Sequence, residues 1–222
     1  MKQILTIALC VITLSGSAQK RLKFDDFNEV KVFDLIEVNL IKSDFNGVEI
    51  TGDDIEDVEV INREGKLKIR MDIDKIFNGE RTFVSVYYTN LKIIDGNEGA
   101  FIVSNELIDQ DYIELRAQEG ARLKIGLDVD RVKIKSVTGG IVETRGKAIT
   151  QEIFLNTGGI YEGKDFETKN TKVNIKAAGE AEIHASNDVE AKVLAGGDVY
   201  IYGNPNHVKE KTTLGGRIQR MN

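Results

Sequence analysis

Thr138-Gly139-Gly140-Ile141-Val142 decides the fold, because variants of this stretch recur at nearly constant spacing almost to the C-terminus. Counted at their second glycines, from Gly140 to Gly216, the copies are separated by steps of 19, 20, 18 and 19 residues. Two weaker copies, around Gly120 and Gly99, extend the series backwards by 20 and 21 residues. A period held this closely indicates a repeat architecture. The other full copies are Thr157-Gly158-Gly159-Ile160-Tyr161, Ala177-Ala178-Gly179-Glu180-Ala181, Ala195-Gly196-Gly197-Asp198-Val199 and Leu214-Gly215-Gly216-Arg217-Ile218.

Each repeat divides into three short segments. A first strand carries alternating apolar residues, namely Leu91/Ile93, Ile113/Leu115, Val132/Ile134, Ile153/Leu155, Val173/Ile175 and Ala191/Val193. After the glycine turn, a second strand carries Phe101/Val103, Leu123/Ile125, Val142, Tyr161, Ala181/Ile183, Val199/Ile201 and Ile218. A third segment carries one apolar residue, namely Leu107, Val129, Ile149, Phe166, Val189 or Val208. Three short segments in about 19 to 20 residues predict an all-β, single-stranded β-solenoid.

Stacking explains how so few apolar residues per coil can build a core. Equivalent residues of successive coils, about 4.8 Å apart, form continuous aliphatic rows, and every backbone amide pairs with a neighbour. Glycine at the same corner permits a left-handed or strained backbone where a Cβ atom would clash. The alternatives are a β-sandwich or a β-propeller, but propeller blades need about 40 residues and aromatic signatures that this sequence lacks. The expected structural turn residues are Gly140, Gly159, Gly179, Gly197 and Gly216.

Residues 24–94 alternate like strands but without the regular period, so they form either extra coils or a separate cap. Within them, Asn62-Arg63-Glu64-Gly65 lies between two alternating segments and predicts a hairpin with glycine at a positive φ. Residues 72–77 are the best helix candidate and are short. Because the ends of a solenoid expose unpaired strands, both ends need caps. The basic residues 217–222 are candidates for the C-terminal one.

Residues 1–18 have the pattern of a signal peptide. Lys2 precedes an apolar run over residues 4–14, and Gly16-Ser17-Ala18 supplies the small residues of a cleavage site before Gln19. The apolar run is shorter than the roughly 20 residues of a spanning helix, and Leu9 is too bulky for a lipidation signal at Cys10. We therefore expect an exported protein whose residues 19–222 form a single domain, irregular over 24–94 and regular over 95–222.

Cleavage would leave a mature chain that is acidic and free of thiols. Cys10 is the only cysteine, so disulfides cannot stabilise the mature chain. Loss of Lys2 changes the formal net charge from −6 to −7, which disfavours nucleic acid and anionic membrane surfaces as partners. No second apolar run approaches membrane-spanning length, so we expect no transmembrane segment after cleavage.

Two further stretches, taken with the glycine turns, resemble a known family. They are the opening Phe24-Asp25-Asp26-Phe27-Asn28-Glu29-Val30-Lys31-Val32 and the closing Tyr202-Gly203-Asn204-Pro205. Over about residues 20–222 the chain resembles the auto-transporter adhesin head domain, or GIN domain, of Bacteroidota, although it has Gly-Gly or Ala-Gly where many relatives have Ser-Gly-Ser/Ala-Gly. The resemblance implies a β-helix-like fold, favours a right-handed coil, and implies export and adhesion without catalytic residues. We expect the periplasm or the outer membrane as readily as the cell surface.

Acidic residues are the candidates for hidden catalysis, since some β-helices degrade polysaccharides. A lyase needs clustered carboxylates that hold Ca²⁺ and a basic residue that abstracts a proton. Asp128 and Asp130 beside Arg131 fit in part, but Asp128-Val129-Asp130 alternates as any exposed corner does. We therefore interpret these residues as a solvated face and expect no catalytic residues. The other acidic candidates are Asp53, Asp54, Asp109 and Asp111.

The remaining motifs predict neither a metal site nor a cofactor. His184 and His207 are the only histidines, and neither has a second ligand at metal-binding spacing. Gly196-Gly197-Asp198 resembles calcium-binding glycine-aspartate repeats, but their nine-residue period is absent. The glycine turns are not followed by a helix or a Gly-Lys-Ser/Thr sequence, so they are not phosphate loops.

Tyrosines are the more promising binding residues, because aromatic rings can stack on sugars. If Val199 and Ile201 face inward, Tyr200 and Tyr202 share the outer face and are candidate glycan contacts; stacking on neighbouring coils is the alternative. The remaining tyrosines are Tyr87, Tyr88, Tyr112 and Tyr161.

The sequence thus favours an exported, non-enzymatic β-solenoid that presents a regular surface to a polysaccharide or to another envelope protein. A polysaccharide-degrading β-helix is the competing hypothesis, and it requires carboxylates from adjacent coils to converge in one groove. The third is a structural envelope protein that associates with itself through its exposed strand edges.

Overall fold

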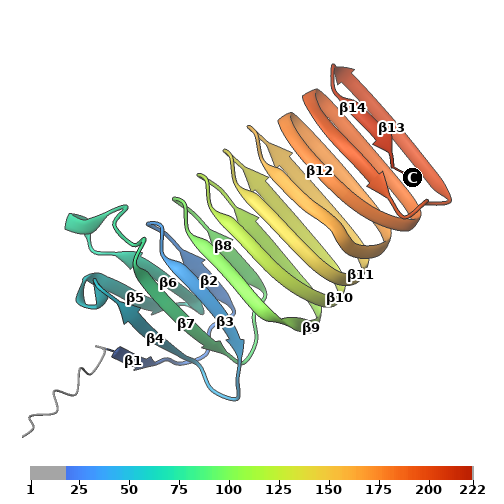
Figure 1. The fold of residues 1–222 in the computed structure, drawn as a ribbon. Coiled ribbons are helices and arrows are strands. Elements are labelled where there is room, and N and C mark those ends of the chain that lie inside the picture. The colour runs from blue at the N-terminus through green and yellow to red at the C-terminus, as the bar shows by residue number, and fades with distance from the viewer. Residues whose placement is uncertain (1–18, 222) are drawn as a thin grey trace, which may run out of the picture.

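The computed structural model describes residues 19–221, and the expected signal peptide (1–18), with Cys10, lies outside them. These residues form β-strands and two short 3₁₀ turns, η1 (Ile55–Asp57) and η2 (Ile73–Lys75), the second within the helix candidate of residues 72–77 (Figure 1). None of the helices in this described part is long and apolar enough to cross a membrane. The strands are β1 (Gln19–Lys23), β2 (Glu29–Val32), β3 (Glu37–Lys42), β4 (Gly47–Gly52), β5 (Val58–Arg63), β6 (Lys66–Met71), β7 (Thr82–Tyr88), β8 (Ile93–Gly96), β9 (Phe101–Ala117), β10 (Arg122–Val137), β11 (Ile141–Asn156), β12 (Ile160–Tyr202), β13 (His207–Leu214) and β14 (Arg217–Arg220).

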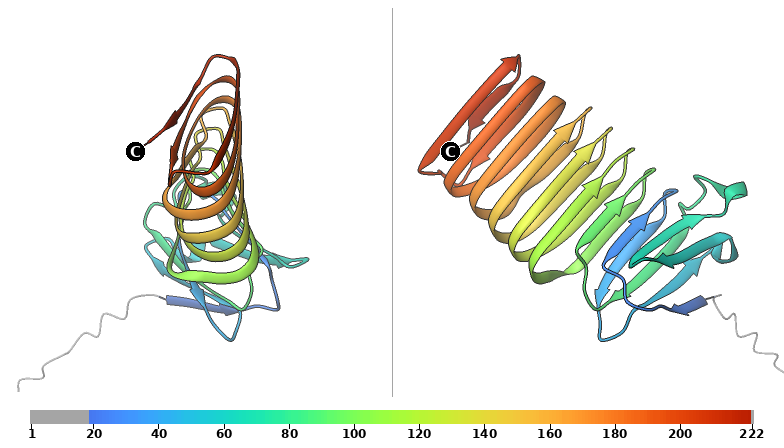
Figure 2. Two further views of the ribbon diagram at one scale, coloured as in Figure 1. Left: turned by 90° about the vertical axis from the view of Figure 1, so that its right-hand side faces the viewer. Right: turned by 180° about the vertical axis from the view of Figure 1, so that it is seen from behind.

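The chain winds into a β-solenoid of about seven turns with roughly 19 residues per coil, as the sequence predicts. From β9 to β14 every coil pairs in parallel with the next, for example Leu123 with Val142 and Ile134 with Ile153. Viewed nearly end-on, each coil is a flattened loop with two long sides, which are joined by a tight turn at one end and a curved bend at the other (Figure 2). The two sides give the molecule two broad outer faces.

The two glycines of each turn have different structural roles. The first glycine has a positive φ, 72° at Gly139 and 75° at Gly158, and in both copies the preceding threonine has a φ of 50°. The second glycine has another role, because an added Cβ would lie 2.4 Å from the Ala117 carbonyl oxygen at Gly140 and 2.0 Å from that of Ser136 at Gly159. Close approach of the adjacent coil, rather than backbone conformation, therefore requires glycine at these two second positions.

In the two weaker copies of the turn, the single glycine corresponds to the first glycine of the full copies, whereas the spacing in the sequence predicts the second. Arg122 pairs with both Ile141 and Phe101, so Gly120 and Gly99 correspond to the first glycine of the full copies. Alanine occupies the second position in both, as Ala121 and Ala100. Gly96 of the preceding coil lies beneath Ala121, where an added Cβ would be 3.2 Å from the Ala121 Cβ. A small residue in the neighbouring coil thus makes room for the alanine.

Residues 24–94 supply both extra coils and a cap. Strands β2 and β3 form a coil of their own, which pairs in parallel with β8 and β9 on one side and with β6 and β7 on the other. Its corner has the same shape as the glycine turn, but Asp34 and Leu35 supply the positive φ values of 59° and 62°. Beyond β6 and β7, the antiparallel strands β5, β4 and β1 end the stack. The β5–β6 hairpin turns at Glu64-Gly65, which confirms that prediction.

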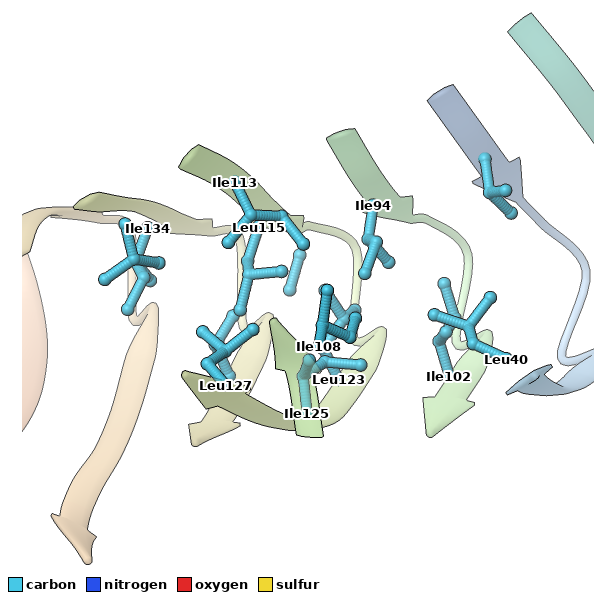
Figure 3. Packing of buried hydrophobic residues seen from close by; sticks show 14 of the residues in the cluster. Leu40, Ile94, Ile102, Ile108, Ile113, Leu115, Leu123, Ile125, Leu127 and Ile134 are labelled. Carbon is cyan, nitrogen blue, oxygen red and sulfur yellow. The ribbon is translucent and has the colours of Figure 1, made fainter. Parts of the chain in front are cut away.

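Aliphatic side chains from successive coils fill the interior (Figure 3). Some positions differ from the sequence expectation because the strands shift phase. Ile102 is buried, whereas Phe101 and Val103 face partly outward, and Ile94 is buried in place of Ile93. In the third segment, Leu107 and Ile149 are 48% and 43% exposed, and the neighbouring Ile108 and Ala148 point inward instead. Extra residues near the bend, where the coil-to-coil register shifts, account for the error at Leu107.

The C-terminal coil ends the solenoid with charged residues at inward positions. Glu210 pairs in register with Ala191, and Arg220 pairs with Ile201, so both stand where other coils have buried apolar side chains. Their side chains form an ion pair with an Nε–Oε1 distance of 3.6 Å. Inward-pointing charges on an edge coil oppose the addition of a further coil.

Candidate binding surface

Two broad faces carry the outward side chains of the stack. We call one the charged face; it consists of β2, β6, β8, β13 and the later halves of β9, β10 and β11, with the corresponding parts of β12. The opposite face, which we call the tyrosine face, consists of β3, β7, β14 and the earlier halves of the long strands. Because equivalent residues of parallel coils lie about 4.8 Å apart, each outward position forms a row along the solenoid.

One row on the charged face alternates in charge and is called the alternating row. Its members, in order along the solenoid, are Glu114, Lys133, Glu152 and Lys172, followed by Glu190 and Lys209. The hydrogen bond from Lys192, with the charges of Lys209 and Lys172, holds the pKa of Glu190 below its usual value. Each charge therefore has an opposite charge in the coil before or after it, and this row has little net charge.

The next row, two residues further along each strand, is mostly basic and is called the basic row. Asp95 is its only carboxylate, and Asp95 Oδ2 forms an ion pair with Lys31 Nζ at 3.4 Å. Phe154 and Asn174 stand between Lys135 and the last two lysines. The basic members are Lys68, Lys31, Arg116, Lys135, Lys192 and Lys211.

A pocket of about 380 Å³, which we call the charged pocket, lies between the alternating row and the basic row on the charged face. Four basic residues and two acidic ones line it, so its charge is positive; these are Lys31, Arg116, Lys133, Lys135, Asp95 and Glu114. Burial raises the pKa of Glu114, but Arg116 at 2.9 Å and Lys133 at 3.4 Å outweigh it and lower the pKa below its usual value. Lys135 makes no ion pair with any of residues 19–221.

A shallow groove of about 670 Å³ crosses four coils at the bend beside the alternating row, and we call it the polar groove. Its wall includes Asn170 and Asn206, which are linked through Asn187 by side-chain hydrogen bonds of 3.1 and 3.2 Å. Such asparagine ladders stabilise stacked strands. Lys172 and Lys209 form part of its lining, so the groove opens onto the charged face.

The interior beneath the polar groove contains hydrogen-bonded polar side chains. The Tyr161 hydroxyl is fully buried and lies 2.6 Å from Thr144 Oγ1, and Gln151 Nε2 donates to it. Thr171 then donates to Gln151 Oε1 at 3.3 Å. Burial is the main cause that raises the pKa of Tyr161. The cluster fills inward positions that hold aliphatic residues in other coils.

Replacing Tyr161 with phenylalanine is expected to destabilise the protein by about 2 kcal/mol, because the buried Thr144 and Gln151 side chains would lose a partner. Urea denaturation followed by circular dichroism measures the change. The matched control is Tyr112→Phe, since this half-buried hydroxyl makes no hydrogen bond with any described residue, and we expect a change below about 0.5 kcal/mol. Equal stability of the two variants would contradict the role of the buried cluster.

Tyr200 and Tyr202 do share an outer face, between the buried Val199 and Ile201. The two are both half-buried but differ in their side-chain partners. Lys164 Nζ lies 5.1 Å from the centre of the Tyr202 ring, and the Tyr202 hydroxyl donates to Glu182 at 3.2 Å. Tyr200 has no such side-chain partner among residues 19–221. The other tyrosines lie elsewhere: Tyr88 and Tyr161 are buried, Tyr87 stacks on Phe45, and Tyr112 packs under Arg131.

The acidic candidates stack at the bend between coils. Asp109 pairs in register with Asp128, so carboxylates of adjacent coils do come side by side. Lys147 binds Asp128 at 3.3 Å, and neither aspartate lines one of the grooves described above. Asp53 lies far from them and binds Arg81 at 3.0 Å. Within the described part of the chain, no three His, Cys, Asp or Glu side chains are placed to hold a metal ion.

The histidines and the glycine-aspartate motif have structural surroundings. His184 Nδ1 lies 3.0 Å from the Lys164 carbonyl oxygen, and His207 is exposed at the rim of the polar groove. Asp198 accepts two hydrogen bonds from Arg217, at 2.9 and 2.8 Å. These bonds lower the pKa of Asp198 and join the last two coils.

Sequence reasoning missed Phe154 and the basic row. Phe154 is the aromatic residue of the charged face nearest the middle of that row, and Lys176 Nζ lies 5.1 Å from its ring centre. The sequence did contain a signal for the basic row: its members stand two positions after the members of the alternating row, on the same face. Aligning Lys135, Lys192 and Lys211 on the repeat would have found it, but that alignment requires the register of the coils.

The fold defines a class: an extended β-solenoid whose outward side chains form rows along two broad faces. Within that class, the chain belongs to the family described as "Putative auto-transporter adhesin, head GIN domain", whose sequence model matches residues 26–205. This confirms the family resemblance noted in the sequence. No curated protein matches the chain.

Several solved structures have the same fold at low sequence identity. A "putative adhesin" from Bacteroides fragilis is 15% identical with a TM-score of 0.85, covering 93% of this chain and 98% of the other. A "putative adhesin" from Parabacteroides distasonis is 17% identical with a TM-score of 0.73, covering 93% and 97%. A "putative lipid binding protein" from the same organism is 16% identical with a TM-score of 0.70, covering 94% and 98%. At such identities the likeness concerns the fold alone.

Proposed function

We propose that this protein is an exported, non-enzymatic, adhesin-like module that binds a polysaccharide or another component of the cell envelope. The carrying observation is the polar groove of about 670 Å³, which crosses four coils and is lined by amide, hydroxyl and charged side chains. A groove of this kind offers hydrogen bonds to successive units of an extended ligand. Membership of a family named for adhesion supports the proposal, and so does the shared fold of two structures named as adhesins.

Two locations are compatible with this function, the periplasm and the outer membrane with its outer surface. The signal-peptide pattern of residues 1–18 supports export. The family name supports the cell surface. We propose the cell envelope without dividing it further.

Tyr200, together with Tyr202, is proposed as a second glycan contact, on the tyrosine face and separate from the polar groove. The Tyr200 ring is the more available of the two, because Lys164 covers the ring of Tyr202 and Glu182 binds its hydroxyl. A sugar bound there would stack on Tyr200, and Tyr202 would serve as a neighbour.

The stacked aspartates Asp109 and Asp128 are the observation that keeps the degrading enzyme as the second candidate. Affinity electrophoresis of the purified protein through gels that contain different polysaccharides separates the two functions, when the gels are assayed afterwards for new reducing or unsaturated chain ends. We expect retardation without new ends. New ends would contradict the non-enzymatic proposal, and Asp128→Asn, which should leave binding intact, would then be the variant to test for loss of cleavage.

Removing the Tyr200 ring should show whether the tyrosine face binds the polysaccharide. Tyr200→Ala tests the tyrosine face, and Tyr112→Ala is its control at the bend, since Tyr112 lies outside both the polar groove and the tyrosine face. Loss of retardation in Tyr200→Ala alone would place the ligand on the tyrosine face. No retardation by any polysaccharide would contradict the proposal; sedimentation at several concentrations would then test self-association.

A further inference from the structure

The charges of this acidic protein are unevenly placed. The formal net charge of the chain is −6, yet the basic row holds six cationic side chains and one carboxylate, Asp95. On the tyrosine face, the corresponding row holds one cation and three carboxylates, namely Lys124, Glu143, Glu162 and Glu182. A positive stripe on an otherwise negative protein concentrates anions at one face.

We propose that the basic row binds a linear anionic polysaccharide, with its chain running along the solenoid axis and a carboxylate or sulfate group in the charged pocket. This inference rests on the proposed function and names the ligand class. Its cations fall in pairs from adjacent coils, Lys68 with Lys31, Arg116 with Lys135, and Lys192 with Lys211. Asp95 separates the first two pairs, and Phe154 and Asn174 separate the last two. Within each pair the cations lie about 4.8 Å apart along the axis, so a chain that carries a charge on each or every second sugar can meet several of them.

The charged pocket is the best-formed position along the row. Its cations exceed its anions, and both of its carboxylates are already bound, Asp95 by Lys31 and Glu114 by Arg116 and Lys133. Lys135 makes no ion pair within residues 19–221 and is exposed. An incoming carboxylate or sulfate would therefore find a cation without displacing an existing partner.

The surroundings of the row fit a sugar chain. Phe154 is half-buried in the middle of the row, and Lys176 Nζ lies 5.1 Å from its ring centre, so an apolar surface and a further cation lie side by side at this position. On the side away from the alternating row, the next outward residues are the uncharged Gln118, Val137 and Asn156. Hydrogen-bonding and apolar groups beside a line of cations suit a polymer that is charged at intervals.

The width of the row favours a linear chain over a membrane. A bilayer of anionic headgroups would cover the alternating row as well, where the paired charges add no net attraction. A single polymer chain can follow the basic row alone. A second copy of this protein is a poorer partner, because Glu143 and Glu162 on its tyrosine face are already bound by Arg122.

Titration of the purified protein with polygalacturonate, and with dextran as the uncharged polymer, tests this inference. We expect polygalacturonate to bind, and binding to weaken strongly between 0.05 and about 0.5 M salt because exposed charge pairs are screened. The triple variant Lys135→Gln, Lys192→Gln, Lys211→Gln should bind roughly tenfold more weakly. Its matched control is Lys75→Gln, Lys124→Gln, Lys147→Gln, which has the same change in net charge on other surfaces and should bind as tightly as the original protein.

Different failures have different meanings. If dextran or another uncharged polysaccharide binds and polygalacturonate does not, the ligand class is wrong although the proposed function stands. If no polysaccharide binds, both fail. Equal weakening in the two triple variants would show a general charge effect and overturn the basic row as the site. Binding to phosphatidylglycerol vesicles that matches or exceeds binding to polygalacturonate would replace the polysaccharide with a membrane, and concentration-dependent sedimentation without ligand would replace it with a second copy.

Discussion

Replacing Phe166 with alanine is expected to lower the free energy of unfolding by about 4 kcal/mol, since truncation of a buried phenylalanine costs about 3 to 5 kcal/mol. The Phe166 side chain is fully buried at the bend, where it pairs in register with Gly146. An added Cβ at Gly146 would lie 2.1 Å from the Leu127 carbonyl oxygen, so the neighbouring coil offers no side chain to fill the space. The cavity would therefore remain, and the coils could close it only by moving the backbone.

Urea denaturation followed by circular dichroism measures this change, with Phe83→Ala as the control. Phe83 is 48% exposed on the tyrosine face, and its truncation should cost about 1 kcal/mol or less. Because repeat proteins can open coil by coil, hydrogen exchange should show the loss of protection concentrated in β11 and β12. A uniform loss of protection, or a cost similar to that of Phe83→Ala, would contradict the packing described for the bend.

Gly159→Ala is the second large effect, with an expected cost of about 3 kcal/mol, at the upper end of overpacking. An added Cβ would lie 2.0 Å from the Ser136 carbonyl oxygen and 2.4 Å from its carbon, and both atoms are backbone. The two coils would have to separate, which would weaken the hydrogen bonds on both sides of the turn. Thermal unfolding monitored by circular dichroism measures the change.

The neighbouring glycine provides the control for this prediction. Gly158 has a φ of 75°, and the nearest atom to an added Cβ is 3.7 Å away, so Gly158→Ala meets strain but no clash. We expect a cost of about 1 kcal/mol, as for other residues forced into the left-handed region. A larger cost for Gly158→Ala than for Gly159→Ala would reverse the division of roles between the two turn positions.

Alternation in the sequence identified the inward face of most strands but not the register between coils. A shift of two residues keeps every side chain on the same face, so the pattern cannot distinguish one register from the next. The sequence aligned Val132/Ile134 with Ile153/Leu155, yet in the structure Ile134 pairs with Ile153 and Ser136 pairs with Leu155. Backbone pairing of whole coils, which no local pattern records, decides between them.

The interior was also predicted to be apolar throughout, and Gln151 shows why that fails. Gln151 and Thr171 are 3% exposed and occupy inward positions, because Tyr161 and Thr168 satisfy their hydrogen bonds. Tyr161 was expected to face inward, whereas Gln151, Thr168 and Thr171 are polar in the sequence and were not among the expected inward residues. Only the presence of all of them in neighbouring coils makes burial favourable.

The candidate binding surface depends on the same long-range register. Lys135 and Arg116 are 19 residues apart and adjacent in space, and Lys192 and Lys211 repeat that spacing. The sequence instead drew attention to Tyr200 and Tyr202, whose alternation with Val199 and Ile201 is visible within four residues. Local patterns therefore found the tyrosine face, whereas the charged face required the fold.

Lysine footprinting tests the central claim most directly. The purified protein would be acetylated briefly with and without polygalacturonate, and the modification of each lysine measured by mass spectrometry. The account predicts protection of Lys135, Lys192 and Lys211 with unchanged reactivity of Lys124, Lys147 and Lys164. Protection of Lys124 and Lys164 instead would place the ligand on the tyrosine face and contradict the claim that the basic row binds it.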